Sequence, residues 1–241
     1  MSFSRNIALF SALFSAQALS PAAFATTGDS EWGGEAELGL VTTSGNTETT
    51  TANFKGKLEN NREQWKHLLT FESLHASSED NNTAERYLLT AKSSYKINDV
   101  SYAFGRFSYE DDRFSGYDYR ATETLGYGRH IIREETLKFD VEGGPGARQS
   151  KPENGSTDSE GIVYLSANVK WDVSETSVFT QDLFSEIGED VTVTKSVTGL
   201  KTQINGDLAM KTTYTIKQTS KVPTGIDKTD TETAVTLVYS F

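Results

Sequence analysis

Apolar and polar residues alternate along most of the chain, and short groups of turn-forming residues interrupt the alternation. The final stretch, residues 233–241, shows this clearly because Val235, Leu237, Tyr239 and Phe241 fall on one face of an extended strand. Chain ends fray and exposed apolar strand faces aggregate unless something covers them. In a transmembrane barrel, lipid covers the outer face and closure pairs every strand edge. The terminus therefore predicts the last strand of such a barrel.

Twelve segments share this period of two. They lie at residues 32–43, 47–60, 64–77, 83–97, 100–112, 117–132, around 137–141, and at 160–173, 175–187, 191–204, 208–222 and 233–241. With both termini placed in the periplasm, the turns on that side (60–63, 98–99, 133–134, 173–174 and 205–207) are short, and the longest polar loop, 150–158, lies outside. The sequence therefore predicts an all-β fold, a single antiparallel transmembrane β-barrel of about 12 strands.

The first 25 residues differ from the rest of the chain. Arg5 supplies a positive charge, residues 7–19 are mainly apolar, and Ala23, Phe24 and Ala25 form a small-x-small cleavage site. A retained membrane anchor is the alternative, but the apolar run is too short to span a bilayer. We therefore predict a Sec signal peptide at 1–25, a short linker at 26–31 and a barrel exported to the outer membrane at 32–241.

The composition narrows the classes of function. The chain carries 23 basic and 34 acidic residues, a net charge of −11, and loss of the signal segment with Arg5 makes it more negative. Nucleic-acid binding is not expected, because phosphates require a basic surface. The absence of cysteine excludes disulfides and thiolate metal sites. A mean hydropathy of −0.49 is low for a soluble core but ordinary for a barrel with one polar face.

The polar face of the predicted strands carries charges of both signs. The expected lumen-facing residues are Lys55, Lys57, Glu59, Lys66, Glu72, Arg86, Lys92, Lys138, Asp140, Glu142, Lys211 and Lys217. Twelve strands enclose an interior between the filled eight-strand barrel and the open porin of about 16 strands. The charges therefore either pair and fill the lumen or line a narrow water-filled path, and their mixed signs define no ion selectivity.

Aromatic residues cluster near the predicted strand ends, as they do where barrel walls cross the lipid–water interfaces. The expected periplasmic girdle contains Trp32, Trp65, Tyr95, Tyr102, Trp171, Tyr239 and Phe241, and the outer one contains Tyr109, Phe114, Tyr117 and Tyr119. The sequence does not decide which side chains of the fifth and sixth predicted strands point outward. Arg106 lies on the same side as Tyr102, and Glu123 lies on the same side as Leu125. A bulge would re-aim these side chains. Residues 143–146 (GGPG) predict a bend.

Catalytic and metal-binding signals are weak, and we expect neither an enzyme nor a cofactor. The histidines His67, His75 and His130 lie on separate predicted strands, and no G-x-S-x-G elbow surrounds any serine. A Ser/His pair involving His75 or His130 is the alternative. Acidic groups such as 79–80 and 110–112 are read as solubilising loop charge, with weak Ca²⁺ or Mg²⁺ binding as the alternative.

Several segments carry a family resemblance. They are WGGEAELGL and TTSGNTETT within residues 32–50, YDYR at 117–120, LGYG at 125–128, GGPGAR at 143–148 and the aromatic terminus. Over these, the chain resembles the YdiY-like family of salt-induced outer membrane proteins, a domain of unknown function. The resemblance implies an outer-membrane barrel linked to salt or osmotic stress, with no catalytic residues to transfer.

The expected role is a narrow channel for small solutes or ions. A structural barrel plugged by side chains and a soluble periplasmic β-sandwich that binds a ligand are the alternatives. Expected partners are outer-membrane lipid, lipopolysaccharide and the barrel-assembly machinery. Exported barrels that this chain resembles present a C-terminal aromatic signal to that machinery, which assigns the signal to Tyr239 and Phe241.

Overall fold

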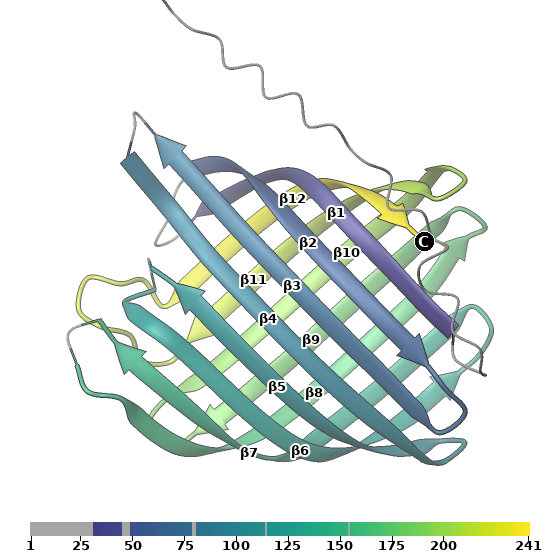
Figure 1. Ribbon diagram of the computed structural model, residues 1–241, viewed down its shortest axis with the longest axis horizontal. Helices are drawn as coiled ribbons and strands as arrows, with labels where there is room; N and C mark the ends of the chain where they lie inside the picture. The colour runs from purple at the N-terminus through teal and green to yellow at the C-terminus, as the bar shows by residue number, and fades with distance from the viewer. Residues whose placement is uncertain (1–30, 45–48, 79–80, 114, 154) are drawn as a thin grey trace, which may run out of the picture.

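The strands close into one antiparallel barrel in the computed structural model, which describes residues 31–241 except 45–48, 79–80, 114 and 154 (Figure 1). Each strand pairs with its neighbours in sequence, and β1 pairs with β12. The twelve strands are β1 (Glu31–Ser44), β2 (Thr49–Asn61), β3 (Trp65–Ser78), β4 (Asn81–Asn98), β5 (Ser101–Asp112), β6 (Tyr117–Arg133), β7 (Leu137–Pro152), β8 (Asp158–Ser174), β9 (Ser177–Gly188), β10 (Thr192–Asn205), β11 (Leu208–Thr219) and β12 (Thr229–Ser240). Closure excludes the two-sheet sandwich.

The period of two explains which side chains lie outside. Along β12, Ala234, Thr236 and Val238 are buried, whereas Val235 and Leu237 are exposed. Large apolar side chains cover the outside of the other strands in the same way, and Leu125 on β6 is 71% exposed. An apolar surface of this extent on a closed sheet is typical of a protein covered by lipid. No helix in the described part of the chain is long and apolar enough to cross a membrane.

The seam between β1 and β12 holds the chain end. The Phe241 amide donates to the Gly34 carbonyl at 3.0 Å, and the Gly34 amide donates to the Phe241 carbonyl at 2.8 Å. Gly34 also leaves space for the aromatic ring, because a Cβ on this residue would lie 2.4 Å from Phe241 Cζ. The last residue is therefore part of the closing ladder.

The two ends of the barrel differ. We call the end that holds Glu31 and Phe241 the terminal rim and the opposite end the loop rim (Figure 1). Connections at the terminal rim are short: 62–64, 99–100, 134–136, 175–176 and 206–207. At the loop rim the longest connection is 220–228, whereas the sequence predicted 150–158. Strand β7 extends to Pro152, so the loop expected there shrinks to 153–157.

The long 220–228 connection has a local cause. Strand β11 was predicted to reach residue 222 but ends at Thr219. Pro223 cannot donate a ladder hydrogen bond, its carbonyl accepts from the Ile226 amide at 3.2 Å in a turn, and Gly225 adopts a φ of 90°. These features take the chain out of the ladder before β12 begins.

The GGPG patch interrupts pairing on one side of β7 without ending the strand. Gly144 and Pro145 pair with Tyr164 and Val163 of β8, but the register with β6 contains neither residue. Proline has no amide hydrogen for that ladder. Gly144 is required because a Cβ there would lie 2.1 Å from the Leu125 carbonyl oxygen. The expected bend is thus a local gap between β6 and β7.

Strands β5 and β6 keep a continuous register through their middles, so no bulge re-aims their side chains there. Arg106, Tyr102 and Phe104 all face the lumen, which makes the expectation for Tyr102 wrong: it is 9% exposed and lies inside. Gly128 creates the space, because a Cβ on it would lie 2.3 Å from the Tyr102 ring. Glu123 lies on the outer face, opposite Phe107 in the register.

Candidate lumen site

The inner wall is covered by ion pairs, and most of the lumen-facing residues named from the sequence take part in them. The pairs are Lys55–Glu72 (2.6 Å), Lys57–Glu59 (3.5 Å), Lys66–Glu59 (2.9 Å), Arg86–Glu232 (2.8 Å), Lys92–Glu142, His130–Asp140 (2.6 Å), Lys211–Glu37 (2.9 Å) and Lys217–Glu110 (2.7 Å). Lys138 lines the cavity described next. The lumen therefore carries positive and negative charge in close alternation.

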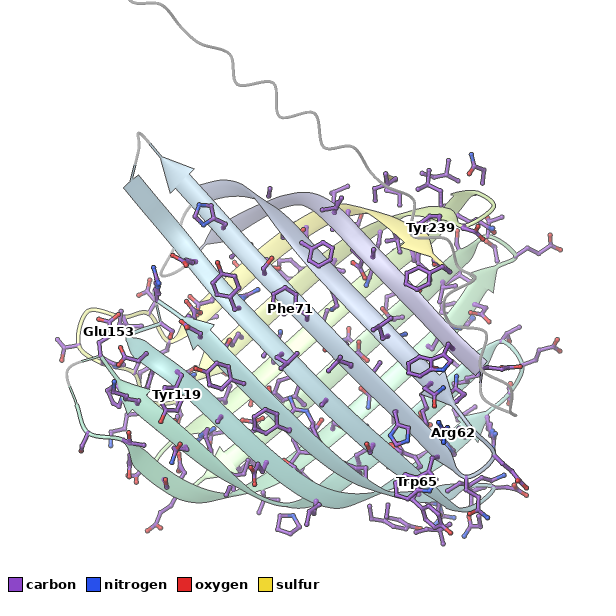
Figure 2. The ribbon with its side chains drawn as sticks, in the orientation of Figure 1. Arg62, Trp65, Phe71, Tyr119, Glu153 and Tyr239 are labelled. Carbon is purple, nitrogen blue, oxygen red and sulfur yellow. The ribbon has the colours of Figure 1, made fainter. Side chains whose placement is uncertain are left out.

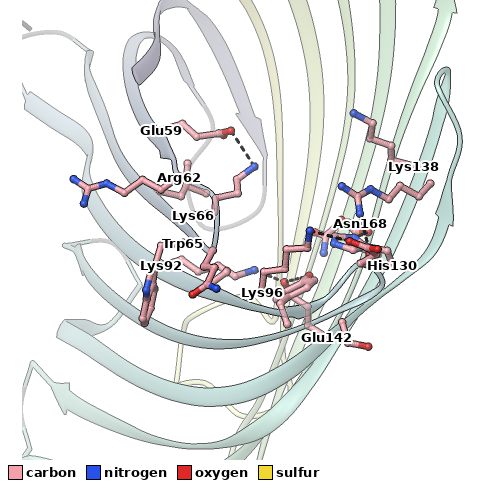
Figure 3. Close-up of a pocket in the computed structure, with 18 of the residues that line it drawn as sticks. Glu59, Arg62, Trp65, Lys66, Lys92, Lys96, His130, Lys138, Glu142 and Asn168 are labelled. Carbon is pink, nitrogen blue, oxygen red and sulfur yellow. Dashed lines mark hydrogen bonds and ion pairs between the residues drawn. The ribbon is translucent and has the colours of Figure 1, made fainter. Parts of the chain in front are cut away.

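A cavity of about 650 Å³ lies inside the terminal rim, and we call it the terminal chamber (Figure 3). Glu59 and Lys66 line one wall, and Lys138, Asn168 and His130 come from the facing strands. Asp99 lies at the edge of the chamber in the β4–β5 turn, where the Lys96 ammonium at 2.8 Å lowers the pKa of its carboxyl group. Basic and acidic groups are mixed, so the chamber has no single sign.

Glu142 closes the inner end of the terminal chamber. Its Oε1 accepts a hydrogen bond from the Tyr102 hydroxyl at 2.6 Å and pairs with the Lys92 ammonium, and its Oε2 accepts from the Ser166 hydroxyl at 3.2 Å. A buried carboxylate is stable only when its oxygens are bonded in this way. Glu142 therefore ties β4, β5, β7 and β8 together across the lumen.

Beyond Glu142, an aromatic layer fills one side of the lumen. The ring centroids of Phe104 and Tyr164 lie 6.0 Å apart, and those of Tyr164 and Phe184 lie 6.1 Å apart. The Arg106 guanidinium lies 5.2 Å from the Tyr164 centroid and pairs with Glu186 at 3.2 Å. Cation–π and ion-pair contacts together hold this layer in place.

Nearer the loop rim, ion pairs cross the lumen. Lys217 on β11 donates to both oxygens of Glu110 on β5, at 2.7 and 2.9 Å. These strands face each other, because β6 to β10 separate them on one side and β4 to β1 and β12 on the other. Arg86 on β4 likewise reaches Glu232 on β12 at 2.8 Å. We call Lys217–Glu110 and Arg86–Glu232 the crossing pairs, and together they constrict the lumen.

The aromatic residues named from the sequence lie at both rims of the outer surface. Trp65, Tyr239 and Tyr119 mark these positions in Figure 2. Near the terminal rim the structure exposes Trp32, Trp65, Tyr95, Trp171, Tyr239 and Phe241. At the other rim, Tyr109 and Tyr119 stack with centroids 5.8 Å apart, whereas the Tyr117 ring packs against Arg120 beside a cavity. Phe114 lies outside the described residues.

Several partners in the lumen were not named as site residues from the sequence. They are Glu37, Arg106, Glu110, Arg120, Arg148, Glu186, Lys201 and Glu232. The alternation along each strand could have predicted that these side chains point into the lumen. Their pairing, however, depends on which strands lie opposite one another across the lumen. Glu110 and Lys217, for example, are 107 positions apart.

The histidines form no recognisable catalytic site. His130 bonds to Asp140 at 2.6 Å, and no hydrogen bond between His130 and a serine occurs among the described residues. His67 lies outside, where its ring stacks on Trp65 and bonds to the Ser93 hydroxyl at 2.9 Å. His75 is exposed. Within the described ranges, no group of three or more histidine, aspartate or glutamate residues is arranged to hold a metal.

The sequence and fold were compared with known proteins. Residues 36–241 match the family described as "Protein of unknown function, DUF481". The chain belongs to this family. The chain is also similar in sequence to the "Uncharacterized protein YdiY" of Escherichia coli strain K12, with 31% identity over 165 residues. That match covers 68% of this chain and 65% of YdiY, so the chain spans slightly less than two thirds of its relative. The predicted YdiY-like membership is confirmed.

Solved structures share the fold at low sequence identity. The NanC porin has a TM-score of 0.59 and 10% identity, with 85% of this chain and 98% of that chain covered. The KdgM porin, solved in complex with disordered oligogalacturonate, has a TM-score of 0.52 and 14% identity, with 86% and 99% covered. At these identities the likeness shows the fold alone. The DUF481 chain has the fold of outer-membrane porins, and the predicted all-β barrel is confirmed.

Proposed function

We propose that the protein is a narrow, low-conductance channel for small ions and small polar solutes, limited by the crossing pairs. The observation that carries this proposal is that the paired charges in the lumen stay partly accessible to water. Lys55 and Glu72 are 32% and 23% exposed, and Lys217 and Glu110 in the constriction are 13% and 18% exposed. A wall of hydrated charge supports ion passage better than a dry apolar core does.

The mixture of signs argues against strong selectivity. Single-sign rings of charge select ions of the opposite sign. Here Lys55 faces Glu72 and Lys201 faces Glu35 at 2.6 and 2.7 Å, so these two ammonium groups are each offset by a nearby carboxylate. The proposed pathway therefore passes small cations and anions with little preference, and the crossing pairs exclude longer solutes.

A structural barrel without transport is the second candidate. It is favoured by the aromatic layer of Phe104, Tyr164 and Phe184 together with the crossing pairs, since these fill the lumen at successive levels. Either role places the protein in the outer membrane, with lipid and lipopolysaccharide around the apolar surface and the terminal rim in the periplasm. The family resemblance extends the proposal to a role under salt or osmotic stress.

Ion flux from vesicles distinguishes the two candidates. Purified protein is refolded into vesicles loaded with potassium chloride, and vesicles with heat-unfolded protein are the control. The channel predicts faster loss of both ions than the control and retention of a trapped oligosaccharide. Ion loss no faster than in the control would overturn the channel and leave the structural barrel.

Location and assembly have their own test. A barrel in the outer membrane sediments with that membrane, and its folded form migrates differently from the boiled form in SDS gels. Protein recovered from the soluble periplasmic fraction would contradict the location. We also propose that Tyr239 and Phe241 engage the barrel-assembly machinery, a role supported by their exposed rings beside the closing seam.

A further inference from the structure

Arg120, on the inner wall of β6 near the loop rim, is a buried cation with no carboxylate bonded to it. It is 9% exposed, and its guanidinium carbon lies 3.9 Å from the centroid of the Tyr117 ring. Among the described residues, no ion pair or side-chain hydrogen bond includes the Arg120 guanidinium. Burying a charge without a bonded partner is costly, so an unpaired guanidinium at this depth favours an anion from outside the chain.

Two carboxylates near Arg120, those of Glu110 and Glu160, are each bonded to another basic side chain. Glu110 lies directly opposite Arg120 in the β5–β6 register, but both of its oxygens accept from Lys217. Glu160 accepts from Arg148 at 2.6 Å and from the Asp190 amide at 3.1 Å. These bonds leave Arg120 free to donate in the plane of its guanidinium, because the Tyr117 ring covers only one flat face.

A cavity of about 280 Å³ lies beside Arg120, and we call it the mouth pocket. Ser150, next to Arg120 in the β6–β7 register, lines it together with Pro152 and Pro223. Residues Val222 and Pro223 of the 220–228 loop belong to this lining, and the yellow loop lies beside the ends of β5 to β7 in Figure 1. A Cβ placed on Gly116 would lie 3.0 Å from Pro223 Cγ, so the loop packs against the opposite side of the rim.

We propose that the mouth pocket binds a small oxyanion, a carboxylate or phosphate group, through Arg120. The planar guanidinium offers two parallel N–H groups that match two oxygens of such an anion. Ser150 supplies a hydroxyl donor at the neighbouring position of the wall, and Tyr117 keeps the guanidinium in one orientation. The volume suits a small acid rather than a chain of sugars. This site is independent of whether the lumen conducts.

Isothermal titration calorimetry on the full refolded chain in zwitterionic detergent tests the site, with inorganic phosphate and acetate as separate probes. We expect saturable binding of one or both, and the better probe identifies the oxyanion class. Arg120→Gln weakens binding by about tenfold or more, since a charge-assisted pair is lost. Arg120→Lys falls between, because an ammonium keeps the charge but loses the planar fork.

Arg129→Gln is the matched control, because Arg129 lies nine positions further along the same strand and is exposed on the outer face. It should bind phosphate as the unmodified protein does. Heat-dependent gel migration confirms that each variant is folded. Binding that survives Arg120→Gln, no saturable heat with either probe, or equal displacement by chloride would overturn the proposal. Ion flux does not enter this test, so a non-conducting barrel can still satisfy it.

Discussion

The Glu110–Lys217 crossing pair provides a direct test of whether opposite walls of the barrel are coupled. Lys217→Met removes the ammonium and leaves the Glu110 carboxylate without its two hydrogen bonds. Glu110→Gln leaves the ammonium without a counter-charge. The double variant removes both charges and keeps similar volume. A double-mutant cycle over these proteins isolates the pairwise free energy.

The expected magnitude follows from distance and exposure. The two oxygens lie 2.7 and 2.9 Å from the Lys217 nitrogen, and the two side chains are 13% and 18% exposed. Exposed pairs contribute about 0.2–1 kcal/mol, whereas breaking a fully buried pair costs about 3–5 kcal/mol. Partial burial places this coupling between those limits, at about 2 kcal/mol, or roughly a 30-fold change in the unfolding equilibrium constant.

Reversible urea unfolding in lipid vesicles, followed by tryptophan fluorescence, measures the coupling. The Lys151–Asp118 pair is the matched control, because its 2.6 Å separation is as short but its side chains are 43% and 39% exposed. Its cycle should give no more than about 0.5 kcal/mol. A coupling free energy near zero for the Glu110–Lys217 cycle, equal to that of the control cycle, would refute the reasoning. The lumen would then screen these charges as bulk water does.

Three further outcomes are expected, from the lipid-facing surface, from the space around the Tyr102 ring and from the seam between β1 and β12. Leu125→Arg should destabilise the barrel in vesicles by about 2–4 kcal/mol in urea unfolding, because it places a charge on the lipid face. Gly128→Ala should cost about 1–3 kcal/mol in the same assay, since its Cβ would meet the Tyr102 ring at 2.3 Å. Phe241→Asp should lower the yield of heat-modifiable barrel in cells, because it replaces the aromatic ring that packs at Gly34 with a charged group.

Each of these has a matched comparison. Leu125→Phe keeps an apolar surface and should be tolerated, and an equal loss from both Leu125 variants would contradict a lipid-covered face. Gly161→Ala meets no atom within 4 Å and should change stability by less than about 0.5 kcal/mol. Thr157→Asp lies in the 153–157 loop, and assembly as poor as that of Phe241→Asp would count against a special role for the terminus.

Strand number and most strand positions follow from the sequence, because a wall with one apolar and one polar face requires a period of two. Alternation does not predict the facing of a side chain that has both an apolar part and a polar group, such as tyrosine. Tyr102 lies inside although an aromatic was expected outside, because Glu142 accepts its hydroxyl and Gly128 gives its ring space. Glu123 is the opposite case, because a charged side chain lies on the otherwise apolar outer face.

The candidate site was harder to anticipate than the fold. Alternation names Lys217 as a lumen residue, but its partner depends on barrel closure, which brings β5 and β11 face to face. The mouth pocket depends on a loop that crosses the rim, and the chain was expected to stay in β11 through residue 222. Long-range geometry of this kind leaves no local signature in the sequence.

Single-channel recording in planar bilayers tests the central claim, that the crossing pairs limit a narrow ion pathway. The unmodified protein should give small, uniform current steps. The variant carrying Glu110→Ala and Lys217→Ala should give larger steps, because removing both side chains widens the constriction. Equal step size in the two proteins would contradict the constriction, and the absence of steps from both would contradict the channel itself.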